Sequence, residues 1–183
     1  MKTQDLLRDA LRQAHIYLEL KLDLCPEHVM FEAPPGSTIA SIAAIYAHIV
    51  LTEDAFMHRQ LRGAAPPLYE SAEWISRVTF PPKVAQDRGW TAAFRTDMNA
   101  FRQYAQAVFA AGESAFTALT DEDLPRPLLS HFVHVKDGRP LVERREVALG
   151  LPFSDNVIMH TCEHTGEISA LLGSRGLQGS HWG

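Results

Sequence analysis

The sequence contains only two cysteines in 183 residues, and Cys25 and Cys162 match no Cys-x-x-Cys spacing. Two distant cysteines cannot form the disulfide framework of a small secreted protein, so we expect a reducing compartment. No apolar run reaches the roughly 18 residues that cross a bilayer. The first residues also lack the apolar segment of a signal peptide. We therefore predict a cytoplasmic protein that does not bind membranes.

The sequence also lacks a basic excess, since 17 Lys and Arg face 22 Asp and Glu, which gives a net charge of −5. This balance argues against nucleic acid or an anionic membrane surface as a partner. Glycine-rich phosphate-binding patterns, Gly-x-Ser-x-Gly and His-Glu-x-x-His are all absent. None of the nine histidines follows a Glu by three positions, which argues against a di-iron carboxylate bundle.

What the sequence does contain is helical periodicity, in four stretches. They cover about residues 3–24, 37–63, 91–119 and 152–175. Thr3 and either Ser37 or Thr38 are the expected N-caps of the first two helices, and Gly176 is expected just past the end of the last. The whole chain, residues 1–183, is therefore predicted to form a single all-α domain, a four-helix bundle.

Two connections between these helices are long. Residues 64–89 contain two proline pairs and the aromatic residues Tyr69, Trp74 and Phe80. This stretch either covers a site as a lid or packs its own aromatic rings on the bundle, and both interpretations stay open. Residues 125–150 have apolar segments on both sides of Asp137-Gly138. That pair is typical of a tight turn, so we predict a short β-hairpin there.

Two histidines of the last helix form the first candidate site. His160 and His164 lie four residues apart and therefore project from one face, on a stripe that should meet the core. Two imidazoles on such a stripe need compensation for the loss of water. A metal ion or hydrogen-bonded partners would each provide it, and the spacing alone does not decide between them.

His48 changes this balance in favour of a metal ion. It lies in the middle of the apolar second helix, where a lone histidine is usually a hydrogen-bonded core residue. In a four-helix bundle, however, facing helices place ligands in a shared interior. Together His48, His160 and His164 would supply three nitrogens and leave at least one coordination position open, as in catalytic sites.

Glu167 lies one turn beyond His164 and is the candidate catalytic residue. It could accept a hydrogen bond from a ligand imidazole or act as a base, or it could be an ordinary solvated carboxylate. Four further histidines, His15, His28, His58 and His181, are expected at the surface or in loops.

The sequence resembles the DinB/YfiT-like superfamily of metal-binding four-helix bundles. The segment from His160 to Ile168, with His164, Gly166 and Glu167 inside it, is similar to the last-helix pattern of that family. Residues 42–53 resemble its second helix, with His48 as the first ligand, and residues 119–124 resemble the end of its third helix. Order and spacing agree over almost the whole chain.

The resemblance implies that His48, His160 and His164 bind nickel, zinc or a similar divalent ion, and that the protein is a homodimer. It also implies a thiol-dependent transferase, in which a small thiol such as mycothiol, bacillithiol or glutathione attacks an electrophilic small-molecule substrate. Two departures stand out. Glu167 occupies a position where Gln is common, and all three ligand candidates are histidines, whereas the mycothiol-dependent isomerases use a Glu as one ligand.

Three functions are compatible with these residues. The first is a metal-dependent transferase that joins a low-molecular-weight thiol to an electrophile. The second is a metal-dependent hydrolase that uses the same three-histidine site to activate water. The third is a helical binding or stress-related protein without catalysis, whose metal is structural or absent. Dependence of turnover on a thiol distinguishes the first function from the second.

Overall fold

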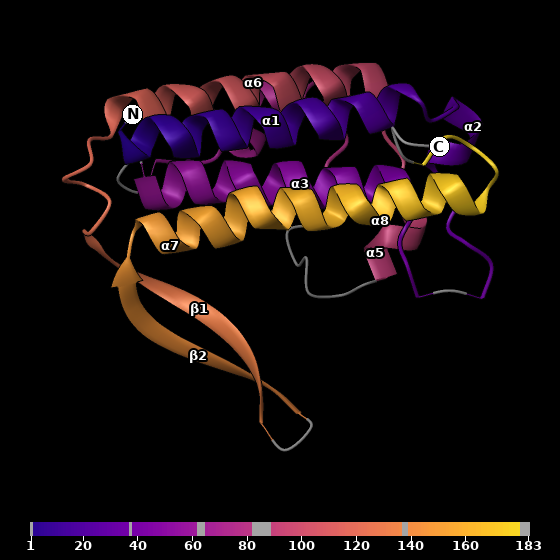
Figure 1. Cartoon of the computed structure of the whole chain (residues 1–183). Helices are drawn as coiled ribbons and strands as arrows, with labels where there is room; N and C mark the ends of the chain where they lie inside the picture. The colour runs from indigo at the N-terminus through magenta and orange to yellow at the C-terminus, as the bar shows by residue number, and fades with distance from the viewer. Residues whose placement is uncertain (1, 37, 62–64, 82–88, 137–138, 180–183) are drawn as a thin grey trace.

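Four long helices lie side by side in the computed structural model, which describes residues 2–36, 38–61, 65–81, 89–136 and 139–179 (Figure 1). These helices are α1 (Thr3–Asp23), α3 (Ile42–Phe56), α6 (Met98–Ala118) and α8 (His160–Ser174). Each helix contacts two others: α1 and α3 both pack against α6 and α8. The predicted four-helix bundle is therefore confirmed.

Shorter elements connect the long helices. The helical ones are α2 (Glu27–Met30), α4 (Ala72–Ile75), α5 (Gly89–Ala93), α7 (Gly150–Phe153), the 3-10 turn η2 (Leu68–Glu70) and the π-helical segments η1 (Met57–Leu61) and η3 (Ser154–Met159). No helix among the described residues combines the length and the apolar character needed to cross a membrane.

Three helix starts differ from the prediction, two of them because other side chains cap the helix. Ser41, rather than Ser37 or Thr38, precedes α3, and its hydroxyl accepts a hydrogen bond from the backbone of Ala44. Ser37 lies outside the described residues. The predicted helix 91–119 is interrupted at 94–97, because the Asp97 carboxylate accepts hydrogen bonds from two backbone amides and starts α6 at Met98. Thr3 is the first residue of α1 and not its cap.

The end of α8 agrees with the prediction. Gly176 has a positive φ of 71°, a conformation that glycine adopts without steric cost. Its backbone amide donates to the carbonyl of Gly173, and the amide of Leu177 donates to the carbonyl of Leu172. This pair of hydrogen bonds is a Schellman motif, which satisfies carbonyls that the helix end leaves open.

The predicted hairpin consists of β1 (Pro127–Lys136) and β2 (Arg139–Ala148), which pair antiparallel with Lys136 opposite Arg139. The predicted turn residues, Asp137 and Gly138, lie outside the described residues. The hairpin projects away from the bundle, and it begins and ends beside the start of α7 (Figure 1).

The described part of the connection 64–89 packs on the bundle. Trp74 is 7% exposed, and its ring meets that of Tyr104 on α6 edge-on. Phe80 makes similar contacts with Tyr104 and Phe101. Of the two interpretations of this connection, the described residues therefore support the packing of its aromatic side chains on the bundle.

Helix α3 forms the centre of the core, as its apolar sequence predicts, and most of its residues are buried. It also buries two carboxylates, Glu53 and Asp54, at 1% and 0% exposure. Burial of a carboxylate is costly unless other groups pair with it, so each needs partners. Histidines supply them, which corrects the expectation that His15 and His58 lie at the surface. His181 lies outside the described residues.

Glu53 pairs with a histidine of α1. Its Oε2 lies 2.7 Å from Nε2 of His15, and the His15 ring stacks on Phe109 of α6 at 3.8 Å between centroids. The sequence pattern missed this pairing because the two residues are 38 positions apart. Helices α1, α3 and α6 are thus joined through one buried polar contact.

Asp54 joins α3 to the connection that follows it. Its carboxylate accepts hydrogen bonds from the backbone amides of Leu68 and Tyr69, both at 3.0 Å, and from the Tyr104 hydroxyl at 2.7 Å. His58 Nδ1 lies 2.8 Å from the same carboxylate. Four partners therefore compensate the burial of Asp54 and fix the start of the 65–81 segment against the bundle.

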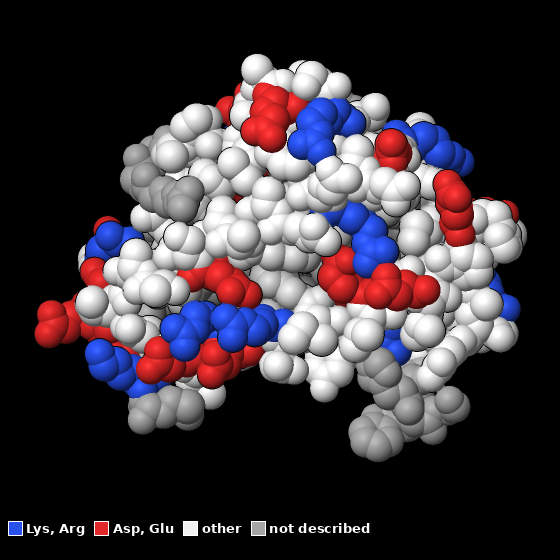
Figure 2. Space-filling model, turned by 90° about the horizontal axis from the view of Figure 1, so that it is seen from above, with Lys and Arg blue, Asp and Glu red and all other residues white. Residues whose placement is uncertain are grey.

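The surface over α1 and α6 carries charges of both signs beside one another (Figure 2). Arg12 of α1 pairs with Glu113 of α6 at 3.0 Å, and Arg102 of α6 bonds Glu19 and Asp23 of α1 at 2.7 and 2.6 Å. Exposed pairs of this kind contribute little stability each, so the buried contacts dominate the packing of these helices.

Gly112 of α6 offers a test of the buried Glu53 contact. A Cβ atom at this position would stand 2.9 Å from Oε1 of Glu53 and 3.3 Å from Cε of Met57. We expect Gly112→Ala to lower the free energy of unfolding by about 1–3 kcal/mol, because the well-packed core must shift. Denaturant unfolding measures this change.

Gly166→Ala is the matched control, because a Cβ at this helical glycine meets nothing within 4 Å. Alanine should stabilise α8 there by up to about 1 kcal/mol. A Gly112→Ala variant as stable as the Gly166→Ala variant would contradict the described packing around Glu53.

Candidate metal centre

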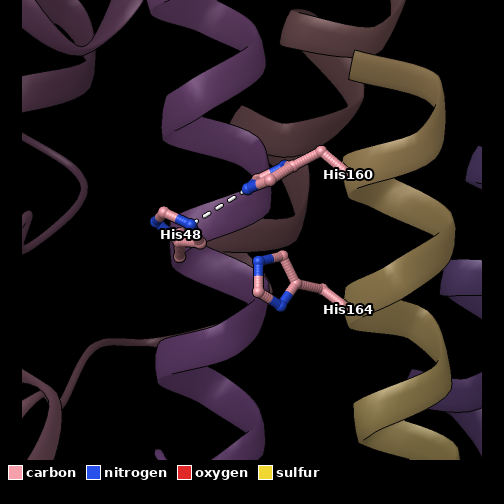
Figure 3. A group of neighbouring side chains, drawn as sticks. All are labelled: His48, His160 and His164. Atoms are coloured by element: carbon pink, nitrogen blue, oxygen red, sulfur yellow. Dashed lines mark hydrogen bonds between the residues drawn. The ribbon is translucent and has the colours of Figure 1, made fainter. Parts of the chain in front are cut away.

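The three predicted ligand residues come together in the structure. His48 extends from α3, and His160 and His164 extend from α8, toward one point between the two helices (Figure 3). One ring nitrogen from each residue can be chosen so that all three lie within 4.8 Å of one another. The ring centroids are 4.5–5.0 Å apart in the three pairs.

The cluster lies at the surface of the bundle rather than in its interior. His48 is exposed, and His160 and His164 are partly exposed. The residues of α8 that do enter the core are Thr161, Thr165, Ile168, Leu171 and Leu172. The predicted core-facing stripe of this helix is therefore corrected: the two histidines lie at its edge, where solvent and small molecules can reach them.

The donor set fits a divalent transition metal. Nε2 of His160 and Nε2 of His48 are 3.0 Å apart. Two nitrogens bound at about 2.0–2.1 Å to one tetrahedral ion would lie about 3.3 Å apart, so this pair needs almost no movement. Three imidazoles and no carboxylate make up the cluster, and such nitrogen donors suit zinc and nickel rather than calcium or magnesium.

Proton affinity in the cluster also favours metal binding. Burial is the main cause that lowers the pKa of His160 to about 3, and the adjacent His48 and His164 act in the same direction. Burial likewise lowers the pKa of His48, with His164 adding to the effect and Glu167 opposing it. Both imidazoles are therefore neutral at pH 7, the form that binds a metal.

Glu167 contacts one of these histidines directly. Its Oε2 lies 2.6 Å from Nδ1 of His164. A carboxylate at this distance accepts the proton on Nδ1, so the lone pair of His164 is on Nε2. This is the hydrogen bond that the sequence predicted as one role of Glu167, and such a bond orients a ligand imidazole and raises its basicity.

A pocket next to the cluster was not identified from the sequence. Thr52 lies four residues after His48 on α3, and Asn156 lies four residues before His160, and both line a pocket of about 290 Å³. The signal was the spacing of four from each ligand, which places a side chain one helical turn away on the same face.

The lowered pKa values predict how the metal-free protein responds to acid. In the unfolded chain a histidine gains its proton near its ordinary pKa of 6.5, whereas folded His160 resists protonation down to about 3. The unfolded state therefore binds more protons in this range, and stability falls as the pH drops below 6.5. We expect His160→Asn to lose less stability than the wild type between pH 7 and 5, measured by urea unfolding. If the free energy of unfolding changed with pH equally in the two proteins, His160 would not be a neutral side chain shielded from solvent.

Comparison with known proteins agrees with this architecture. A crystal structure described as the conserved protein of locus from Enterococcus faecalis matches with a TM-score of 0.66, at 18% sequence identity, over 94% of this chain and 99% of that chain. At this identity the match demonstrates a shared fold only. No curated protein matches the sequence.

Comparison with protein families identifies the family to which the chain belongs. The model of the DinB superfamily matches residues 9–152, which include His48 and end before His160 and His164. The match spans most of the sequence, and the four-helix bundle with its hairpin is consistent with the DinB fold. The chain belongs to the DinB superfamily.

Proposed function

We propose that this protein is a metal-dependent transferase that joins a low-molecular-weight thiol to an electrophilic small molecule. His48, His160 and His164 hold the ion, with zinc or nickel as the proposed metals. A divalent ion held by these three imidazoles would stabilise a coordinated thiolate at neutral pH.

One observation supports this proposal above all others. Three imidazoles from two helices converge within 4.8 Å at a position that solvent reaches, and among the described residues no carboxylate or thiol completes the set. A structural metal site is usually closed by four protein ligands, whereas a catalytic site has three and leaves room for a substrate. The composition of the cluster therefore favours catalysis over a structural role.

Glu167 has two assignments in this proposal. It holds His164 through the contact between Oε2 and Nδ1. Its side chain is 44% exposed, so the same carboxylate is also accessible to a substrate. We assign it as the base that takes the thiol proton, while the sulfur forms a bond to the electrophilic carbon and the leaving group departs with the bonding electron pair.

Metal content tests the ligand assignment. Untagged wild-type protein should contain about one equivalent of a transition metal by mass spectrometry, because three preoriented imidazoles bind such ions tightly. Each of His48→Ala, His160→Ala and His164→Ala should lose most of it. His28→Ala is the control, because His28 is an exposed histidine of the short helix α2. Folded wild-type protein that stays free of metal after growth with zinc and nickel would contradict the assignment.

Turnover tests the reaction. Metal-loaded protein should conjugate a thiol to a chromogenic aryl halide, measured as thioether formation, with no turnover when the thiol is omitted. Glu167→Gln still presents an oxygen to His164 but removes the base, so we expect unchanged metal content and a kcat about 100-fold lower. A Gln variant with wild-type kcat would limit Glu167 to positioning His164. Hydrolysis of ester substrates without any thiol would instead favour the hydrolase.

A further inference from the structure

One face of helix α1 points away from the bundle and yet carries apolar side chains. Four large ones are 41–52% exposed and form what we call the α1 patch: Leu6, Ile16, Tyr17 and Leu20. Ile16 and Leu20 are about one helical turn apart, so they are neighbours at the surface. The opposite face of α1 is also apolar and is buried in the core. A helix that is apolar on two faces is expected to be covered on both, so the patch indicates a partner.

The other three long helices have no such face. Among the described residues, no large apolar side chain of α3, α6 or α8 is exposed. Single exposed apolar residues are normal on protein surfaces, whereas four on the outward side of one helix form a patch. The patch is therefore a feature of α1 and not of the surface in general.

A groove between α1 and α6 adjoins the α1 patch. Ile16 and Leu20 line it from α1, and Phe109 lines it from α6, with the ring of His15 stacked on that of Phe109. Its volume is about 340 Å³. Uncharged atoms separate the charged groups on this side of the molecule (Figure 2). Helices pack by inserting side chains of one into the grooves of another, and this groove can receive apolar side chains of a second helix.

The charged residues of α1 beside the groove decide how a second helix would lie. Arg12 lines the groove, and Asp23 lines it eleven residues further along the helix. If α1 of a second copy lay antiparallel on the first, Arg12 of each chain would meet Asp23 of the other. A parallel arrangement would place like charges side by side. The surface is therefore complementary to itself under a two-fold axis.

Arg12 and Asp23 each have an atom left for a contact between chains. Arg12 donates to Glu113 through Nε and Nη2, and Arg102 donates to Oδ1 of Asp23. Nη1 of Arg12 and Oδ2 of Asp23 have no partner among the described residues, so one further ion pair can form. Exposed pairs contribute little affinity, so the apolar contact provides most of it and the charges set the direction.

We propose that helix α1 packs antiparallel on α1 of a second copy of this chain. Ile16 of each chain then lies against Leu20 of the other, and Arg12 lies beside Asp23 of the other. The inference does not depend on the proposed function, because the histidine cluster lies between α3 and α8, away from this face (Figure 1). The histidine clusters of both copies remain open to solvent.

Sedimentation equilibrium over a range of concentrations tests this contact. The wild-type chain should show a mass near twice the 20.4 kDa of one copy. Ile16→Glu and Leu20→Arg should each raise the Kd of the dimer by about 30-fold or more, as expected for a side chain at the centre of an interface. Both side chains are exposed within one copy, so the circular dichroism spectrum and the metal content should not change.

Ile75→Glu is the matched control, because Ile75 is 59% exposed on the short helix α4 and does not belong to the α1 patch. It should sediment as the wild type does. Val142→Glu tests the hairpin, where Val142 is also exposed. A dimer that dissociates with Val142→Glu but not with Ile16→Glu would overturn the inference, and so would a wild-type chain that stays monomeric.

Exchange of charges tests the antiparallel direction. Arg12→Glu and Asp23→Arg should each weaken the dimer, because every contact between the ends of the two helices then joins like charges. An equimolar mixture of the two variants should associate again, since a chain with acidic groups at both positions meets a chain with basic groups at both. A parallel arrangement would not be weakened by either single change. Variants that dimerise as the wild type does, or a mixture that stays monomeric, would overturn the proposed packing.

Discussion

The packing of α3 against α8 is the contact on which the site depends. It brings Nε2 of His48 within 3.0 Å of Nε2 of His160, a residue 112 positions later in the chain. The two helices run antiparallel beside one another (Figure 1). Any change that moved one helix along the other by a single turn, about 5.4 Å, would separate these ligands completely.

Helix α3 can hold this position because its other faces are fixed to the rest of the bundle. Glu53 and Asp54 are buried and bonded to α1, to α6 and to the connection after η1. Asp54 has four partners and Glu53 has His15, and such buried pairings favour one arrangement, since an alternative would leave these groups unpaired in the core. The same helix thus presents His48 outward to the site and two acidic residues inward to the core.

Periodicity predicted the four helices well, because apolar spacing records which face of a helix is buried. It did not predict the break before Met98, where the capping carboxylate of Asp97 overrides helix propensity. The π-helical segments have no simple sequence signature, since one extra residue per turn depends on what packs against the helix. The burial of His15 was missed because its partner Glu53 is 38 positions away in the sequence. The burial of His58 was missed although its partner Asp54 is only four positions away. The histidine cluster was predictable because two ligands share one helix and the third lies mid-helix in a bundle. Its place at the surface was not predictable, because the apolar neighbours of His48 suggested the interior. The homodimer and the cytoplasmic location remain predictions.

X-ray absorption at the zinc edge of the loaded protein tests most directly whether a three-histidine centre with an open position exists. The spectrum should fit three imidazole nitrogens and one further light atom at about 2.0–2.1 Å, and added thiol should replace that atom by a sulfur at about 2.3 Å. A zinc ion with fewer imidazoles, or one whose four ligands do not change when thiol is added, would contradict the proposed centre.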